Sequence, residues 1–206
     1  AGLLSEGYLF DGDKASSGTD TETSVNPVSS YGAKIGNLGY STLNAAITAA
    51  TYNDQGAQSV NDEIVMLADS DGPITVAMPN SCFTLDMNGH KITSAEDYGL
   101  GIVPSDLVQP NNADVIIKNG TINVTGEETI GVATNGTLSG INVELVDVNI
   151  TSDGLGVYLP ADGWYFIEGG SVKGGSTAVE IRAGMLELRG ASLTGGNGEY
   201  SVSPNG

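Results

Sequence analysis

Apolar residues recur at fixed positions in four eight-residue windows of this chain. The windows read VIIKNGTI, VELVDVNI, YFIEGGSV and LELRGASL, and they span Val115–Ile122, Val143–Ile150, Tyr165–Val172 and Leu186–Leu193. Each window has an apolar residue at positions one, three and eight, and an Asn, Asp or Gly at position five. Successive windows begin 28, 22 and 21 residues apart, so the chain settles into a repeat of about 22 residues.

A repeat of this length, built from strands, is typical of a parallel β-solenoid. A weaker series of short apolar runs follows the same period at Gly131-Val132, Gly156–Leu159 and Ala178–Ile181. Two series with one period indicate coils that contribute to more than one sheet, and residues 57–206 would form about seven coils stacked about 4.8 Å apart. We therefore predict an all-β fold, a parallel β-helix with about 22 residues per coil.

The window positions also predict how the coils stack. Alternate residues point inward, so the position-three residues should lie one above another in the core; they are Ile117, Leu145, Ile167 and Leu188. Asn, Asp or Gly at position five suits a turn with positive φ, and a small residue at position six lets neighbouring coils approach. A looser copy, Thr84–Ile92 (TLDMNGHKI), would carry one extra residue.

The N-terminal part of the chain lacks this periodicity. Residues 1–30 are rich in Ser, Thr, Asp and Gly, and they are predicted to form a flexible arm or linker ahead of a β-helix over residues 31–206. Within residues 41–51, Leu43, Ala46, Ile47 and Ala50 lie on one helical face, and Ser41 occupies the expected N-cap. We expect this helix to cap the first coil.

The last seven residues, 200–206, resemble the start of another coil. The sequence therefore predicts a C-terminal end without a cap, which fits either a piece of a longer solenoid or an end covered by another molecule.

The chain is strongly acidic, with 25 acidic and 7 basic side chains and a formal net charge of −18. Repulsion from phosphate makes nucleic acid and anionic lipid headgroups poor partners. No apolar run is long enough to cross a bilayer, so we expect no membrane insertion. The acidity also helps to keep a β-rich surface soluble.

Several stretches together resemble the right-handed parallel β-helix proteins of the pectate-lyase-like superfamily, in particular the repeats of large secreted or surface-attached bacterial proteins, and the resemblance implies a right-handed winding of the coils. The stretches are IGNLGYSTLNAAITAA (35–50), DEIVMLAD (62–69), FTLDMNGHKITS (83–94), VIIKNGTINVTG (115–126) and TAVEIRAGMLELRGASLTGG (177–196). The resemblance implies the fold and a location outside the cell or at the cell surface. It does not imply one activity, because the superfamily includes lyases, hydrolases, adhesins and phage fibres.

Residues that would carry lyase or hydrolase chemistry do not converge in the sequence. A lyase of this family would need a Ca²⁺ site and a basic residue, but Arg182 and Arg189 belong to different strand series. Arg189 shares window position four with Glu168 and is expected to form a surface ion pair with it. His90, in Asn-Gly-His-Lys, lacks the Gly-His-Gly pattern of the hydrolases. No catalytic residue and no cofactor are therefore predicted.

Three other groups of residues are candidates for binding. Asp69 and Asp71 are spaced closely enough to contribute to a Ca²⁺ site, although Asx-turns explain the pair equally. The aromatic residues Tyr158, Trp164 and Tyr165 are the candidate ligand-binding residues, with packing as the alternative. The apolar N-terminal patch is the candidate assembly segment, formed by Leu3, Leu4, Tyr8, Leu9 and Phe10.

We expect a non-catalytic, extracellular structural or adhesive β-helix module, with head-to-tail assembly through the N-terminal arm as its sharper form. Its partners would be other copies of itself, or glycans or proteins at a cell surface. The alternative is a carbohydrate-binding or polysaccharide-degrading β-helix domain.

Overall fold

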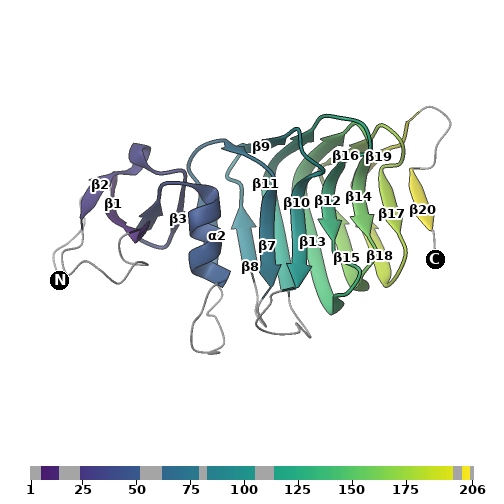
Figure 1. The fold of residues 1–206 in the computed structure, drawn as a ribbon, viewed down its shortest axis with the longest axis horizontal. Helices are drawn as coiled ribbons and strands as arrows, with labels where there is room; N and C mark the ends of the chain where they lie inside the picture. The colour runs from purple at the N-terminus through teal and green to yellow at the C-terminus, as the bar shows by residue number, and fades with distance from the viewer. Residues whose placement is uncertain are drawn as a thin grey trace.

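The computed structural model describes residues 6–13, 24–51, 62–78, 83–104, 114–196 and 201–204. These residues form a β-solenoid of about six turns of about 24 residues, with 62% strand (Figure 1). The predicted all-β parallel β-helix is therefore confirmed, with slightly fewer and longer coils than the repeat indicated. The difference arises early in the stack, where Asp114 and its neighbour Asn142 are 28 residues apart, whereas Asn149 and Ser171 are 22 apart.

The larger sheet follows two consecutive sides of each coil. Its strands are β1 (Tyr8–Asp11), β2 (Val25–Pro27), β3 (Ala33–Ile35), β4 (Leu38–Tyr40), β5 (Asp62–Met66), β6 (Ser70–Asp71), β8 (Phe83–Asp86), β9 (Lys91–Ser94), β11 (Asp114–Val124), β13 (Ser139–Ser152), β15 (Asp162–Glu168), β16 (Ser171–Gly174), β18 (Met185–Arg189) and β19 (Ser192–Thr194). Along one side of the coils the order is β5, β8, β11, β13, β15 and β18, all parallel.

A second sheet forms the remaining side of the coils, and its strands are all parallel. Its strands are β7 (Ile74–Met78), β10 (Tyr98–Pro104), β12 (Ile130–Thr134), β14 (Leu155–Leu159), β17 (Val179–Ile181) and β20 (Val202–Pro204). The weaker apolar series predicted this sheet, because Val132 lies beside Val157 and Val157 beside Val179.

The four windows stack in the predicted register. Ile117 lies beside Leu145, Leu145 beside Ile167, and Ile167 beside Leu188. Ile117, Leu145 and Ile167 are buried at 0, 3 and 2% exposure, whereas Leu188, in the last described coil, is 43% exposed. The inward column of position-three residues is thus the core of the solenoid, as the alternation indicated.

Position five is the corner between the two sides of the larger sheet. The φ angles there are 58° at Asn119, 53° at Asp147, 64° at Gly169 and 68° at Gly190, which confirms the predicted left-handed conformation. Before this corner β11 pairs with β8, and after it with β9. At position six, a Cβ on Gly120 would lie 2.3 Å from the Cβ of Met87, so only glycine fits there.

The looser copy is one residue longer than its sequence indicated. Phe83, rather than Thr84, lies beside Val115, and Ile92 lies beside Ile122. Ten residues therefore face the eight of the next window, and the extra residues form a turn at Asn88 and Gly89, both with positive φ.

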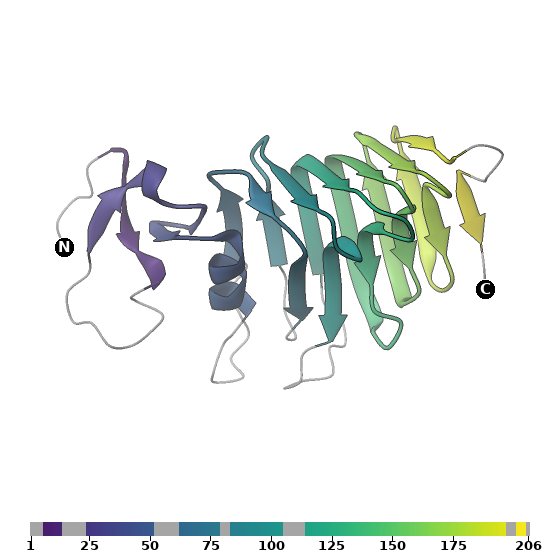
Figure 2. The same cartoon turned by 45° about the horizontal axis from the view of Figure 1, so that its top comes forward.

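The helix α2 (Leu43–Thr51) lies at the N-terminal end of the coils, as predicted (Figure 2). Leu43, Ala46 and Ile47 are at most 3% exposed, and the helix packs against β3, β5 and β7. The predicted N-cap, Ser41, is wrong by one residue. The Thr42 Oγ1 accepts a hydrogen bond from the Ala45 backbone N–H at 3.1 Å, and the Ser41 backbone N–H instead donates to Asp13 Oδ2 at 2.8 Å.

The described part of residues 1–30 contains ordered strands, where the sequence predicted a flexible arm. Strand β1 pairs in parallel with β4 and antiparallel with β2, and a 3₁₀ turn (Val28–Ser30) follows β2. The apolar pattern explains the difference, because Leu9 is only 5% exposed against this small sheet. Tyr8 is 44% exposed and Phe10 is half-buried, while Leu3 and Leu4 lie outside the described residues.

At the C-terminal end, where the sequence resembles the start of another coil, strand β20 pairs in parallel with β17. Near this end Met185 is 56% exposed and Leu188 is 43% exposed. No helix in the described part of the chain is both long and apolar enough to cross a membrane.

Candidate functional site

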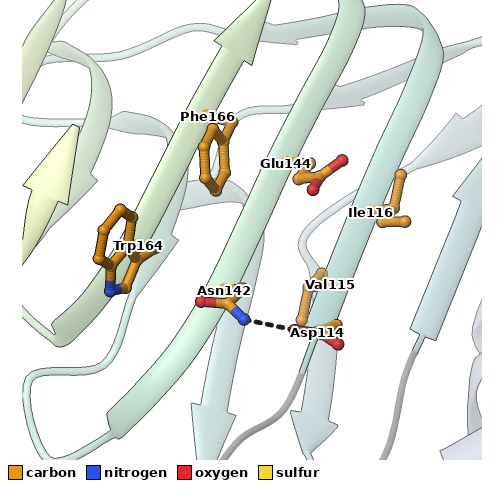
Figure 3. A pocket seen from close by; sticks show the side chains of 7 residues that line it. All are labelled: Asp114, Val115, Ile116, Asn142, Glu144, Trp164 and Phe166. Carbon is orange, nitrogen blue, oxygen red and sulfur yellow. Dashed lines mark hydrogen bonds between the residues drawn. The ribbon is translucent and has the colours of Figure 1, made fainter. Parts of the chain in front are cut away.

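An open groove of about 510 Å³ runs over the outer face of β11, β13 and β15. Figure 3 shows its lining side chains on three neighbouring strands, with Trp164 and Phe166 along one wall. The lining residues are Asp114, Val115, Ile116, Asn142, Glu144, Trp164 and Phe166. We call this feature the β13 groove, because β13 forms its floor.

Strand alternation and register together place six of these side chains on one face, whereas Val115 is at position one of its window and is fully buried. Position-one and position-three residues point inward, so the residues between them point outward. The outward residues form two rows that cross from coil to coil. One row contains Asp114, Asn142 and Trp164, and the other contains Ile116, Glu144 and Phe166. Within β15, Trp164 and Phe166 are two residues apart and share the outer face.

The groove combines an exposed indole with acidic and amide groups. Trp164 is 52% exposed. The Asn142 Nδ2 donates a hydrogen bond to Asp114 Oδ1 at 2.6 Å, which fixes the amide between two coils. Glu144 forms no hydrogen bond or ion pair with any of the described residues. Its side chain lines the groove (Figure 3).

Arg189 lies next to the β13 groove, over Phe166. Its Cζ is 5.3 Å from the Phe166 ring centroid, its Nε donates to Glu187 Oε1 at 2.8 Å, and its Nη1 is 3.7 Å from Glu168 Oε2. The Glu168–Arg189 ion pair confirms the sequence prediction. The hydrogen bond to Glu187, and then the charges of Glu187, Glu168 and Glu144, raise the pKa of the guanidinium above its usual range.

The three aromatic residues predicted as a ligand-binding group do not lie together. Trp164 lies within strand β15 and faces the β13 groove. Tyr165 points inward and is 2% exposed, and its hydroxyl donates a hydrogen bond to the Ala161 carbonyl. Tyr158 lies on the second sheet, with the Arg182 guanidinium 5.2 Å from its ring centroid.

The sequence did not single out the other groove residues, although the repeat of the windows and the alternation of a strand together predict them. The outward neighbours of Trp164 are the residue two positions away on its strand and the residues about one repeat earlier, which are Phe166, Asn142 and Glu144. Tyr165 is next to Trp164 in the sequence, but it occupies position one of its window, and this position points inward.

Asp69 and Asp71, the candidate Ca²⁺ ligands, lie beside a second open groove between the N-terminal cap and the first coils. Asp69 Oδ1 accepts a hydrogen bond from the Lys91 backbone N–H at 3.1 Å and lies 3.3 Å from His90 Nδ1. The Lys91 hydrogen bond is the main cause that lowers the pKa of Asp69. Within the described ranges, no three His, Cys, Asp or Glu side chains come together as a metal site would require.

Lys118 and Arg182 on the outer face are held in ion pairs. The Lys118 Nζ lies 2.7 Å from Glu63 Oε1 and 3.7 Å from Asp86 Oδ2, on the two preceding coils. The hydrogen bond to Glu63 is the main cause that raises the pKa of Lys118. Arg182 donates from Nε to Glu180 Oε1 at 2.9 Å. The two Lys118 contacts link neighbouring strands on the surface, whereas the Arg182–Glu180 pair lies at the end of the single strand β17.

Comparison of the chain with family models, with curated proteins and with solved structures found no match.

Proposed function

We propose that this chain is a non-catalytic β-helix module of a secreted or surface-attached protein, with a structural and adhesive function. The observation that carries the proposal is the β13 groove, where Trp164 is 52% exposed on the flat outer side of stacked strands. Large exposed aromatic side chains on a rigid face are typical of binding surfaces. The resemblance to repeats of surface-attached bacterial proteins supports the same function.

The stack itself suits a structural role. Its core is formed by inward side chains that repeat from coil to coil, so the outer face keeps a fixed geometry over the length of the rod (Figure 1). A binding residue on such a strand is positioned by the strands on both sides of it, and β15 lies between β13 and β18.

The proposal assigns no assembly role to the described part of the N-terminal patch. Strand β1 has a hydrogen-bonded neighbour on each edge, β4 and β2, within the same chain. Donating this strand to a second copy would require these pairs to break first.

The two arginines, which the sequence offered as candidate bases for a lyase, are engaged in surface contacts. Arg182 and Arg189 each form an ion pair with a glutamate and stack on an aromatic ring. These contacts favour a structural role for both arginines over proton abstraction.

A carbohydrate-binding module is the second candidate, because Trp164 offers an exposed flat ring beside the Asn142 amide and two carboxylates. Sugar rings stack on such indoles and accept or donate hydrogen bonds at their edges. Both candidates use the same groove and differ in the ligand.

Binding to arrays of glycans and of extracellular proteins tests the proposal. Fluorescently labelled wild-type chain should be retained at specific spots, and Trp164→Ala should abolish that retention. Tyr158→Ala is the matched control, because this ring lies on the second sheet, and it should bind as the wild type does. No retention on either array, or the appearance of new reducing ends or unsaturated uronates on the glycans, would contradict a non-catalytic adhesive module.

A further inference from the structure

The outer surface of this solenoid twice repeats one arrangement, an arginine stacked on an aromatic ring beside glutamate. Arg189 lies 5.3 Å from the Phe166 centroid with Glu187 at 2.8 Å, and Arg182 lies 5.2 Å from the Tyr158 centroid with Glu180 at 2.9 Å. A guanidinium is attracted to the face of an aromatic ring, and the carboxylate fixes its orientation through hydrogen bonds.

Trp164 has the ring and the carboxylates of this arrangement. Indole is the strongest of the aromatic rings in attracting a cation. Glu144 lies diagonally across from Trp164, and such diagonal neighbours in adjacent strands are within reach of each other's long side chains. The residue directly beside Trp164 on the next coil is Met185, and no cation from the described residues stacks on the indole.

The β13 groove is acidic in an acidic protein. Asp114 and Glu144 line it, and among the described residues no basic side chain lines it. Arg189 lies at its rim over Phe166, where its guanidinium is paired with Glu187 and Glu168, so the rim adds no net positive charge. The whole chain carries a formal charge of −18. A cationic ligand is therefore attracted both by the groove and by the field of the whole molecule.

We propose that the β13 groove binds an extended, arginine-bearing segment of a protein partner, with one guanidinium stacked on Trp164 and hydrogen-bonded to Glu144. This inference rests on the proposed adhesive function and names its ligand class. An extended peptide parallel to β13 places alternate side chains on one side, at a spacing that matches two-residue steps such as Trp164 to Phe166.

The test uses the intrinsic fluorescence of Trp164, the only tryptophan in the chain. A capped peptide of alternating glycine and arginine is titrated into the full chain, and the same peptide with citrulline in place of arginine serves as the neutral isostere. The arginine peptide should change the fluorescence saturably, and the citrulline peptide should not.

Two variants locate the interaction. Glu144→Gln removes the groove charge without changing its shape and should weaken binding of the arginine peptide by roughly threefold to tenfold. Glu127→Gln removes one charge from an exposed turn outside the groove, and it should leave the affinity unchanged. Thermal unfolding of both variants checks that they remain folded.

Four results would overturn the inference. Equal binding of the arginine and citrulline peptides would show that charge is not recognised. If Glu127→Gln and Glu144→Gln weakened binding of the arginine peptide equally, the binding would come from the overall negative charge of the protein rather than from the groove. A neutral cello-oligosaccharide that shifts the fluorescence, with no effect of the arginine peptide, would make the groove a glycan site and leave the adhesive function standing. If no probe shifts the fluorescence, this inference fails, and the array experiment decides the adhesive function separately.

Discussion

At the scale of single residues, the corner at position five shows how a local backbone requirement selects a residue type. Non-glycine residues rarely adopt a positive φ, and Asn and Asp tolerate it better than other residues. The four windows have Asn119, Asp147, Gly169 and Gly190 at this corner, and all four have positive φ. The corner turns the strand from one side of the coil to the next without breaking the parallel pairing on either side.

Asn119 tests this requirement. Asn119→Ala and Asn119→Gly both remove the hydrogen bond that the Asn119 Nδ2 donates to Asp86 Oδ1, so their difference isolates the backbone. We expect the alanine variant to be less stable than the glycine variant by about 1 kcal/mol, because only alanine is strained at φ 58°. Urea unfolding measures both. If alanine were as stable as glycine, the corner would not hold this residue in the left-handed region.

Tyr165 makes a pH-dependent contribution to stability. Its burial, the largest cause, raises the pKa of the phenol from an ordinary value of 10.0 to about 12. Because the folded pKa is above the unfolded one, the contribution is complete below pH 10 and is lost as the pH rises through about 12. Ultraviolet titration of tyrosinate should show a step near pH 12 that Tyr165→Phe removes, with the other tyrosines unchanged. An unaltered titration curve in that variant would contradict the inward position of Tyr165.

At the scale of elements, the N-terminal cap of α2 depends on a side chain one residue away from the predicted one. Thr42 supplies the hydroxyl that accepts from the Ala45 backbone N–H, and its carbonyl accepts from Ala46 at 3.3 Å. The helix covers the first coil with side chains that are almost completely buried. A weaker cap therefore exposes apolar core as well as the helix end.

A pair of alanine substitutions distinguishes the two candidate caps. Thr42→Ala should lower the free energy of unfolding by about 1 kcal/mol, because the Ala45 N–H loses its partner. Ser41→Ala should have an effect within about 0.5 kcal/mol, because the contact to Asp13 uses the Ser41 backbone rather than its side chain. Thermal or urea unfolding gives both values. If Ser41→Ala lowered the free energy of unfolding more than Thr42→Ala does, Ser41 would be the N-cap, as the sequence predicted.

Much of the element order was predictable from the sequence, because a solenoid places like residues above one another. The period of the windows predicted the register of Ile117, Leu145 and Ile167, and the positive-φ corner. Long-range pairing of short segments was not predictable. Strand β1 finds its partners in β2 and β4, and nothing in the composition of residues 1–30 indicates that pairing. The β13 groove required the two-residue alternation and the repeat to be applied together to Trp164.

At the scale of the whole molecule, the central claim is that the chain is one stack of coils in which identical window positions lie above one another. The inward column is the evidence, because Ile117, Leu145 and Ile167 are neighbours in space although each belongs to a different coil. The β13 groove depends on the same register, since it places Asp114, Asn142 and Trp164 in one outward row. A shift by one residue would turn each of these side chains inward.

Methyl NMR on a sample labelled at Ile, Leu and Val tests this register most directly. Strands in neighbouring coils are about 4.8 Å apart, so strong nuclear Overhauser effects should join the methyl groups of Ile117 to those of Leu145, and those of Leu145 to those of Ile167. Ile117→Val and Leu145→Met assign the signals by their loss. If the assigned methyl groups show no such effects, the coils do not stack in this register, and both the solenoid and the proposed ligand site in the β13 groove are contradicted.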